Sequence, residues 1–267
     1  MPAIVYSSLD KAGKNIADHL RKSFGFKPSG DPGGKVPIWE NAEGIILAEI
    51  DTPTITSDYL DSLLRTDLIV FASKHKSESG KPTLTAHPCG NWNEKAEFGG
   101  KPRTLAPTSA LALKAAMMEL AKSALPGFDV VLECTHHGPF LSTPFIFVEI
   151  GSTEKEWAIP EAGEIVAKAC HAACAQKLQA QRIAIGIGGI HYPHEITKEI
   201  LRENIAVGHI CPKYAMEKLD EGMMGQMVEK SGGKVGLALV DWKSLKAHER
   251  EKALSLLRVF NLPHVKV

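Results

Sequence analysis

The sequence predicts an α/β fold in which helices cover both faces of a mixed sheet, a three-layer α/β/α sandwich. Apolar runs of strand length alternate with helix-length periodic segments along all 267 residues, a pattern typical of a sheet with helices packed on it. Several of the strand-length runs are apolar throughout, as expected of strands that are covered on both faces. The alternation is continuous and contains no internal repeat, so we expect a single domain spanning residues 1–267.

Each predicted strand is a short run rich in Val, Ile and Phe. The predicted strands cover residues 3–7, 45–50, 68–73, 83–87, 130–134, 145–150, 183–187, 205–210 and 235–240. Residues 36–50 are expected to form a hairpin around the turn Asn41-Ala42-Glu43-Gly44. Because a hairpin is antiparallel and the helical connections favour parallel pairs, the sheet is predicted to be mixed.

The predicted helices lie between these strands. They cover residues 12–24, 57–65, 108–123, 161–180, 196–203, 213–230 and 244–258. In the first helix, Ile16, Leu20 and Phe24 recur at every fourth position and form one buried stripe. The fourth helix opens with Pro160-Glu161, a favourable start because the first turn leaves amide hydrogens unpaired and proline has none.

Two segments rich in Gly and Pro are predicted to be loops, residues 27–36 and 88–107. The second holds about twenty residues. Loops of that length inside a compact domain are usually functional or mobile. We therefore expect residues 88–107 to contribute to a site.

The composition limits the classes of function. With 44% hydrophobic and 23% charged residues and no apolar run of 18 or more, the chain is typical of a globular protein without a membrane span. Its first residues favour a strand over a secretory signal, and its 5 scattered cysteines favour reduced thiols in the cytoplasm. Because 31 basic residues balance 31 acidic ones, RNA would have to bind a local patch. The local basic clusters are Lys74-His75-Lys76 with Lys81, and Lys95 with Lys101 and Arg103.

Six of the 11 histidines lie at or just after the ends of predicted strands. They are His87, His136, His137, His191, His194 and His209. In open α/β sheets, ligands bind outside the carboxyl ends of the strands, where loops gather side chains from distant parts of the chain. A single histidine is more often a structural residue than a ligand, but six in equivalent positions predict one shared site.

The first motif is His87-Pro88-Cys89-Gly90-Asn91. The strand delivers His87, and Pro88 and Gly90 then turn the chain. The amide of Asn91 is positioned to meet a substrate carbonyl or hydroxyl group. The alternative is an ordinary exit from a strand with Asn in the turn.

The second motif, Glu133-Cys134-Thr135-His136-His137-Gly138-Pro139, is the strongest local signal. Adjacent histidines point in different directions, so one of His136 and His137 could be a general base or metal ligand while the other binds substrate. Gly138 keeps the backbone close to whatever occupies the site.

Glu133 and Glu149 are the candidate partners of these histidines. Glu149 lies within an apolar strand, where an unpaired carboxylate is unfavourable, so we expect it to meet a histidine or a metal. The alternative is a glutamate at the edge or end of the sheet that faces water.

The third motif is Gly188-Gly189-Ile190-His191-Tyr192. Its glycines allow close backbone approach and could offer N–H groups to an oxyanion or a phosphate. Tyr192 could stack on a base, as is common for single-stranded RNA ends. The spacing is not the full dinucleotide-binding fingerprint, so the motif alone is weak.

Two remaining signals are weaker. His209 leaves another strand, followed by Lys213, which could meet a phosphate but, like most surface lysines, is expected to meet solvent. Cys170 and Cys174 lie one helical turn apart, yet no second thiol pair accompanies them, so core packing is favoured over half of a zinc site.

Taken together, the sequence resembles the archaeal and plant D-aminoacyl-tRNA deacylase family over nearly its whole length. The resemblance rests on His87-Pro88-x-Gly90-Asn91, Glu133-x-Thr135-His136-His137-Gly138-Pro139, Gly188-Gly189-x-His191-Tyr192 and Gly208-His209-Ile210. It implies a fold like the phosphorylase/peptidyl-tRNA hydrolase group. It also implies hydrolysis of the ester of D-aminoacyl-tRNA, a chiral proofreading reaction, with dependence on Zn²⁺. The implied partner is tRNA charged with a D-amino acid, and we expect a cytoplasmic monomer.

The expected chemistry is an oriented water and a stabilised tetrahedral oxyanion. His136 or His137, oriented by Glu133 or Glu149, would deprotonate the water, directly or with a bound metal. Substrate is expected to meet His87, Gly90, Asn91, Thr135, Gly138, Gly188, Gly189, His191, Tyr192, His209 and Lys213. The candidate zinc ligands are His87, His136, His191 and His209. Assistance by the 2′-hydroxyl of the terminal ribose is an alternative.

Two other functions fit the same residues. A zinc peptidase or amidase would also place His and Glu at strand ends, and its turnover of peptides would be independent of RNA. A non-catalytic module that binds the tRNA end would bind RNA tightly without turnover. The serine-hydrolase elbow, the H-E-x-x-H motif and the P-loop are all missing from the sequence.

Overall fold

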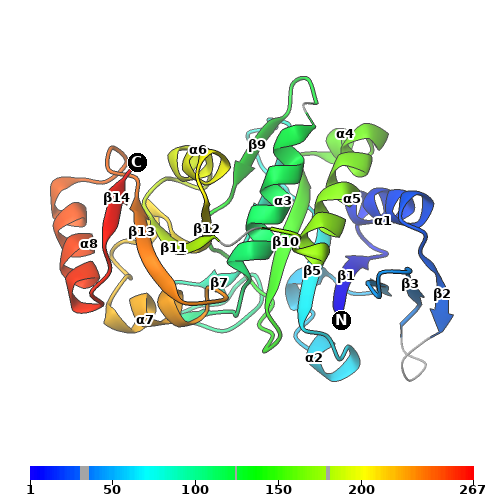
Figure 1. The fold of residues 1–267 in the computed structure, drawn as a ribbon, viewed down its shortest axis with the longest axis horizontal. Coiled ribbons are helices and arrows are strands. Elements are labelled where there is room, and N and C mark those ends of the chain that lie inside the picture. The colour runs from blue at the N-terminus through cyan, green and yellow to red at the C-terminus, as the bar shows by residue number, and fades with distance from the viewer. Residues whose placement is uncertain (31–35, 124, 179–180) are drawn as a thin grey trace.

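The computed structural model describes residues 1–30, 36–123, 125–178 and 181–267, and its strands form two main sheets (Figure 1). The larger has eight strands in the order β2-β3-β4-β1-β5-β10-β6-β9, and the smaller has four in the order β12-β11-β13-β14. The strands of the larger sheet are β1 (Pro2–Ser7), β2 (Lys27–Gly30), β3 (Ile38–Glu40), β4 (Ile46–Ile50), β5 (Leu68–Lys74), β6 (Thr83–His87), β9 (Asp129–Leu132) and β10 (Phe145–Gly151). Those of the smaller sheet are β11 (Arg182–Ile187), β12 (Ile205–Cys211), β13 (Val235–Val240) and β14 (His264–Lys266). A short ladder joins β7 (Gly90–Asn91) and β8 (Thr104–Leu105).

The helices lie between these strands. They are α1 (Lys11–Ser23), α2 (Leu60–Leu63), α3 (Ala110–Lys122), α4 (Glu154–Trp157), α5 (Pro160–Ala175), α6 (His194–Arg202), α7 (Glu221–Glu229) and α8 (Ala247–Val259). Two short 3-10 helices are η1 (Thr54–Thr56) and η2 (Lys213–Ala215). Within the described residues, we find no helix with the length and apolar content needed to cross a membrane.

The larger sheet is mixed, as predicted. Strand β1 pairs in parallel with β4 and β5, whereas β10 pairs in parallel with β5 and antiparallel with β6. The predicted hairpin is the antiparallel pair of β3 and β4. Its turn is closed by the side chain of Asn41, whose Oδ1 accepts from the backbone amides of Glu43 and Ile45 at 3.1 and 2.9 Å. The α/β class and the mixed sheet are confirmed.

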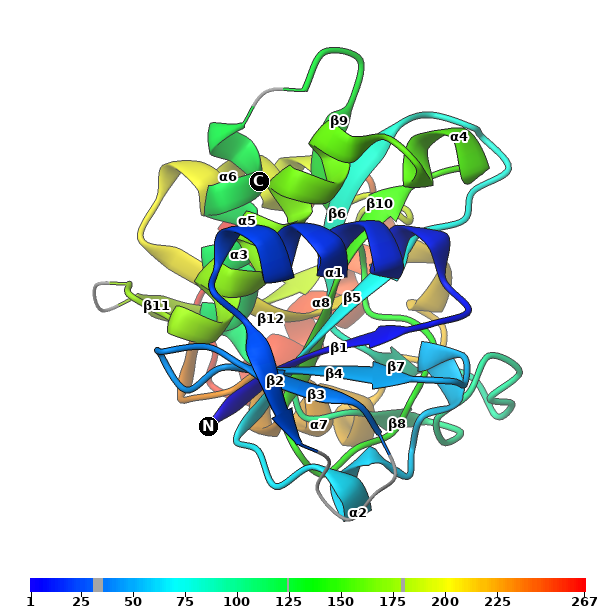
Figure 2. The same cartoon turned by 90° about the vertical axis from the view of Figure 1, so that its right-hand side faces the viewer.

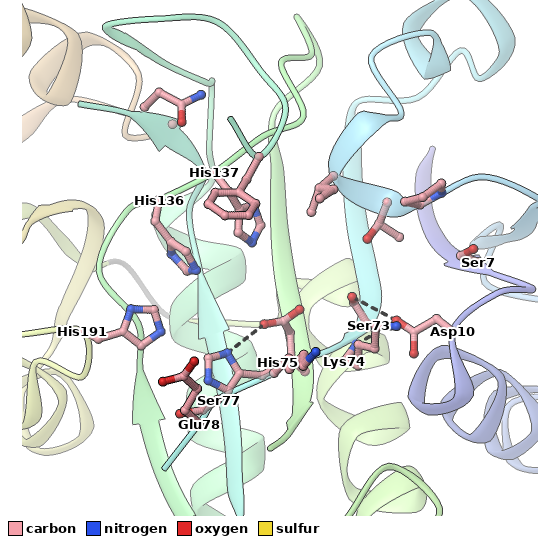
Figure 3. A pocket seen from close by; sticks show the side chains of 18 of the residues that line it. Ser7, Asp10, Ser73, Lys74, His75, Ser77, Glu78, His136, His137 and His191 are labelled. Atoms are coloured by element: carbon pink, nitrogen blue, oxygen red, sulfur yellow. Dashed lines mark hydrogen bonds and ion pairs between the residues drawn. The ribbon is translucent and has the colours of Figure 1, made fainter. Parts of the chain in front are cut away.

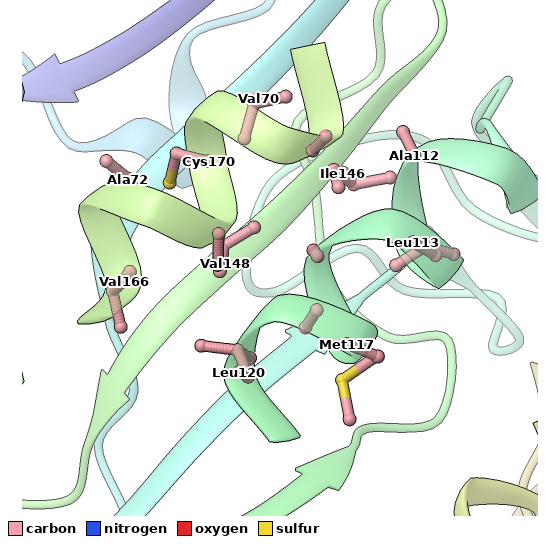
Figure 4. Packing of buried hydrophobic residues seen from close by; sticks show 14 of the residues in the cluster. Val70, Ala72, Ala112, Leu113, Met117, Leu120, Ile146, Val148, Val166 and Cys170 are labelled. Atoms are coloured by element: carbon pink, nitrogen blue, oxygen red, sulfur yellow. The ribbon is translucent and has the colours of Figure 1, made fainter. Parts of the chain in front are cut away.

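Helices α1, α3 and α5 cover one face of the larger sheet (Figure 2). Helix α1 begins where Asp10 caps it, since its Oδ1 accepts from the amides of Ala12 and Gly13. Figure 4 shows Cys170 of α5 and Leu113 of α3 packed on β5 and β10. Cys170 is therefore a core residue, as expected. Short α2 and part of the long 88–107 segment pack on the opposite face.

The smaller sheet is also covered on both faces. Residues of α3 and α6 pack on one face as part of the same core, and residues of α7 and α8 pack on the other. The apolar strands β12 and β13 are buried because helices lie on both sides of them.

Several expected boundaries were wrong. The expected helix over 213–230 begins at α7, because Asp220 caps it there and accepts from Met223 N, and the preceding turn is η2. The expected helix over 57–65 is reduced to α2. Strand β2 falls within the expected loop 27–36. Residues 31–35 of that loop lie outside the described residues, and so do residues 179–180 of the expected helix 161–180. Strand β14 and helix α4 were not predicted.

The segment that follows β9 ties the two sheets together. The amide of Cys134 donates to the carbonyl of His191 at 3.0 Å, and that of Thr135 donates to the carbonyl of Ile210 at 3.0 Å. The hydroxyl of Thr135 in turn accepts from the amide of Ile210 at 2.9 Å. Side chains from the larger sheet therefore meet those after β11 of the smaller sheet.

Candidate active site

A cluster of histidines and carboxylates occupies this junction, chiefly at the carboxyl ends of the strands. Its members are His75 after β5, His87 at the end of β6, Glu133, His136 and His137 after β9, Glu149 within β10, and His191 after β11. Parallel pairing of β6 with β9 places His87 and the residues after β9 at the same end of the sheet. Strand β10 runs antiparallel to β6 and sets Glu149 opposite Thr85, so Glu149 and His75 reach the cluster from the opposite strand direction. The shared site that the sequence predicted at the strand ends is present for these residues.

The cluster lies at a cavity of about 920 Å³ that residues of both sheets line. Figure 3 shows His136, His137 and His191 on one side of it, with His75 near the centre and Asp10 on the other side. A cavity of this size holds a ligand much larger than a free amino acid.

Three of these histidines share one arrangement: Nδ1 lies at hydrogen-bond distance from a backbone carbonyl oxygen. The distances are 3.2 Å from His87 to Pro88 O, 2.8 Å from His136 to Cys134 O and 2.5 Å from His137 to Gly138 O. Because a carbonyl oxygen is an acceptor, Nδ1 carries the hydrogen and Nε2 keeps its lone pair. One nitrogen from each ring lies within 4.8 Å of the others. Three imidazoles that share this tautomer therefore bring ring nitrogens close together.

Burial keeps these three rings neutral. It lowers the pKa of His87 to about 4 and that of His137 to about 3, and it also lowers the pKa of His136. Neighbouring imidazoles add to the effect, since two cations in one site would repel each other. Neutral imidazole is the form that binds metal ions.

The backbone at His137 is held in a strained conformation, with φ at 38° in the left-handed region. Gly138 continues this turn and lies against another segment, because a Cβ added there would be 2.3 Å from Gly100 N. Strain at a non-glycine residue is tolerated where the surrounding structure fixes it, often at functional sites. The expectation that Gly138 allows close backbone approach fits this geometry.

Glu133 is fully buried among imidazoles. Its Oε2 lies 2.8 Å from Nε2 of His191 and 3.5 Å from Nε2 of His136, and its Oε1 lies 3.1 Å from Nδ1 of His75. Neither oxygen of Glu133 has a hydrogen-bond partner among the described residues. Burial opposes its ionisation, but the surrounding imidazoles prevail and hold the pKa of Glu133 well below its usual range.

The pKa values of the two histidines beside Glu133 shift upward, in the opposite direction to that of Glu133. Burial disfavours the cationic forms of His75 and His191, yet the nearby carboxylate of Glu133 outweighs it and raises the pKa of both. Burial first, and then the charge of Glu133, raise the pKa of Glu149 well above its ordinary value. Two buried carboxyls with opposite shifts are typical of sites that separate acid and base roles.

His75 is a site residue that the sequence analysis missed. It is buried, and its Nε2 lies 2.8 Å from the hydroxyl of Tyr192. In the sequence it stands between Lys74 and Lys76, which favoured a solvated basic run. The signal that could have found it is its place directly after an apolar strand, which is the position of the other site histidines.

The predicted oxyanion donors are mostly engaged by the protein. The amide of Gly138 donates to Phe98 O at 3.0 Å, and those of Gly188 and Gly189 donate to Cys211 O and Ser244 Oγ, each at 2.8 Å. The amide of Gly90 donates to the carbonyls of His136 and His137. Asn91 Nδ2 donates to Gly99 O at 2.8 Å but has a second N–H bond, and Asn91 lines the cavity.

Other predicted residues lie apart from the cluster. His209 is fully buried, with Nδ1 3.2 Å from the hydroxyl of Thr135 and Nε2 3.0 Å from Ala106 O. Both of its ring nitrogens have protein partners, so we remove His209 from the candidate metal ligands and treat Thr135 as a residue that joins the sheets. His194 is half exposed, near Asp129.

The donor set fits a metal ion. The groups whose ligand atoms converge are His87 with His136 and His137, His75 with Glu133 and His191, and His87 with Glu133 and Glu149. Nε2 of His87 is buried and has no hydrogen-bond partner among the described residues. Three neutral imidazoles are a common ligand set of catalytic zinc sites.

The fold and this site define a mixed α/β protein whose cavity is lined by histidines and a carboxylate, groups suited to hydrolysis by acid–base or metal-assisted chemistry. The chain belongs to the D-aminoacyl-tRNA deacylase family, whose family model matches residues 63–265. It is 35% identical to a D-aminoacyl-tRNA deacylase of Pyrococcus horikoshii over 100% of both chains. It is 38% identical to one of Methanosarcina acetivorans over 98% of this chain and 91% of the relative.

A solved structure shares the fold of this chain. The crystal structure of a conserved protein of unknown function is 32% identical and superposes with a TM-score of 0.91 over 100% of this chain and 95% of the other. These findings do not favour the peptidase or the non-catalytic binding module.

Proposed function

We propose that this chain hydrolyses the ester that joins a D-amino acid to tRNA, releasing the free amino acid and tRNA. Membership of the deacylase family supports the reaction. The observation that carries the site assignment is that ring nitrogens of His87, His136 and His137 lie within 4.8 Å of one another beside the pair of Glu133 and His191. Charged tRNA is made and used in the cytoplasm, which is where such an enzyme would act.

His87, His136 and His137 are the residues that would hold a zinc ion. Each donates Nδ1–H to a backbone carbonyl, which fixes the ring and directs its lone pair, as in known zinc sites. A bound zinc ion supplies Lewis acidity, which polarises a carbonyl or lowers the pKa of water. This set differs from the sequence expectation, because His137 replaces His191 and His209.

His191 is the base that we assign to the attacking water. His136 and His137 are weak bases because burial lowers the pKa of both, and that of His137 falls to about 3. His191 has a raised pKa, lines the cavity and is 35% exposed at its side chain. Glu133 lies against its Nε2, so Nδ1 is the atom that accepts the proton while the carboxylate stabilises the imidazolium.

Two further residues complete the proposed chemistry. Glu149, kept protonated by burial and by Glu133, is the acid that returns a proton to the leaving ribose oxygen. Asn91 offers its second amide N–H to the oxyanion.

The test is deacylation of matched D- and L-aminoacyl-tRNAs with and without a chelator. We expect rapid hydrolysis of the D-ester, slow hydrolysis of the L-ester, loss of activity on chelation and recovery with Zn²⁺. Zinc content measured on purified protein should be one ion per chain and should fall in the His87→Ala, His136→Ala and His137→Ala variants. Equal hydrolysis of both esters would reject the chiral function, and full activity without metal would reject the zinc assignment.

A further inference from the structure

Exposed apolar side chains gather at the cavity. Leu9, Phe98 and Tyr214 are exposed by 62%, 66% and 63%, and all three line the cavity that holds the histidine cluster. Leaving large apolar groups in water is unfavourable, and contiguous exposed groups commonly mark a binding site. Two of these three are aromatic.

The ring of Phe98 is exposed although the backbone around it is tightly held. Its carbonyl accepts from the amide of Gly138 at 3.0 Å, and the next carbonyl, of Gly99, accepts from Asn91 Nδ2 at 2.8 Å. A Cβ added at Gly99 would lie 1.8 Å from the carbonyl oxygen of Ile55. The loop is therefore packed on both sides, and Phe98 is presented from a fixed position.

Tyr214 reaches the same cavity from the other sheet. It lies in η2, directly after β12, where the amide of Lys213 donates to the carbonyl of Gly189 at 2.8 Å. Two aromatic rings from separate elements thus border one cavity whose inner wall carries the reactive groups.

The cavity must hold a part of the tRNA as well as the amino acid when the proposed substrate is bound. The ester is attached to the ribose of the adenosine at the 3′ end of tRNA, so this nucleoside must lie next to the cluster when the ester does. A cavity of about 920 Å³ is near the upper end for sites that enclose a whole drug-sized ligand. It therefore has room for an aminoacyl-adenosine.

We propose that Phe98 and Tyr214 form the subsite for this terminal adenosine, with the adenine base stacked on Phe98. The inference rests on the proposed function and assigns the part of the substrate that the histidine cluster does not touch. Unpaired RNA ends are commonly held by stacking bases on aromatic side chains. Lys74 and Lys76 line the same cavity, where they favour the 5′-phosphate of that nucleotide.

The test measures kcat and KM with D-tyrosyl-tRNA for wild type, Phe98→Ala, Phe98→Trp and Tyr214→Ala. Phe98→Ala should raise KM about 5- to 150-fold, which corresponds to the loss of about 1–3 kcal/mol for one base–aromatic stack. Tyr214→Ala should raise KM severalfold. In both alanine variants kcat should change less than about threefold, and Phe98→Trp should retain the wild-type KM.

Two probes separate the adenosine subsite from the rest of the site. D-tyrosine ethyl ester lacks adenosine, so its kcat/KM should be the same in wild type and Phe98→Ala. AMP alone should bind wild type, measured by calorimetry, and bind Phe98→Ala at least fivefold more weakly. Val259→Ala is the matched control, because Val259 is an exposed apolar residue on α8 that is absent from the cavity lining.

The outcomes that overturn the inference are distinct from failure of the proposed function. An unchanged KM for D-tyrosyl-tRNA in both alanine variants would refute the adenosine subsite. An equal fall in kcat/KM for D-tyrosyl-tRNA and for D-tyrosine ethyl ester would refute it as well. If wild type hydrolyses no D-aminoacyl-tRNA, the proposed function fails, and AMP binding then decides the adenosine subsite by itself.

Discussion

Replacing Glu133 with Gln tests whether the carboxylate supports a catalytic base. The substitution keeps the size of the side chain and removes its charge beside His191, whose Nε2 lies 2.8 Å from Oε2. At this distance and an effective dielectric constant of about 20, the attraction between carboxylate and imidazolium is about 6 kcal/mol. His191 is 35% exposed, so solvent screening reduces this figure, and we take about half of it. The remaining ~3 kcal/mol corresponds to a fall of about a hundredfold in kcat.

The assay is single-turnover deacylation of a D-aminoacyl-tRNA at saturating enzyme, together with zinc analysis of each protein. Glu133→Gln should keep its zinc, because the three proposed ligands are unchanged, and its loss should lie in the chemical step. His194→Gln is the control, since His194 lies on α6 outside the cavity lining. A rate within about threefold of wild type in correctly folded Glu133→Gln would refute the assignment of His191 and Glu133 as base and support.

Three further predictions concern local geometry. Gly138→Ala should lower the free energy of unfolding by about 1–3 kcal/mol and reduce activity, because its Cβ would lie 2.3 Å from Gly100 N. The control Gly236→Ala should change neither, because its Cβ would meet nothing within 4 Å. Urea unfolding and deacylation measure the two effects. Lys114→Met should lower stability by about 3 kcal/mol in urea unfolding, since the buried ammonium donates to two carbonyls at the end of α6; an unchanged midpoint would contradict this. His137→Gly should be more stable than His137→Ala by about 1 kcal/mol, because φ at this position is 38° and glycine adopts that conformation without strain. Both variants should lose zinc. Equal urea midpoints for the two variants would show that the backbone relaxes in the alanine variant.

Much of the fold follows from local sequence patterns. Strands such as β5 and β12 were predicted because buried strands have continuous apolar runs, and the turn at Asn41 marked the hairpin. The division into two sheets was not predicted, since strand order depends on contacts between residues far apart in the chain. Strand β14 was missed because it has only three residues, all exposed and two of them polar, a pattern that local propensity does not distinguish from a tail.

Part of the site was also predictable from local sequence patterns. Position at a strand end identified His87, His136, His137 and His191, because topology brings such ends together. Which of these histidines presents a bare nitrogen depends on the carbonyl that each Nδ1 meets, and that is set by the backbone after the strand. His209 occupies the same kind of position in the sequence, yet its strand belongs to the smaller sheet and its ring is enclosed by Thr135 and Ala106.

The junction between the sheets determines whether the proposed base and the metal ligands can act together. His191 comes from the loop after β11, whereas Glu133 and the ligand histidines belong to the larger sheet. The backbone of His191 is fixed by the amide of Cys134 at 3.0 Å, the residue that directly follows Glu133. The carboxylate and its imidazole are thus held by the same short segment that joins the sheets. His136 and His137 continue that segment, and the amide of Thr135 donates to the carbonyl of Ile210 in β12 at 3.0 Å. A shift of one sheet against the other would therefore disturb the base and two of the three proposed ligands together.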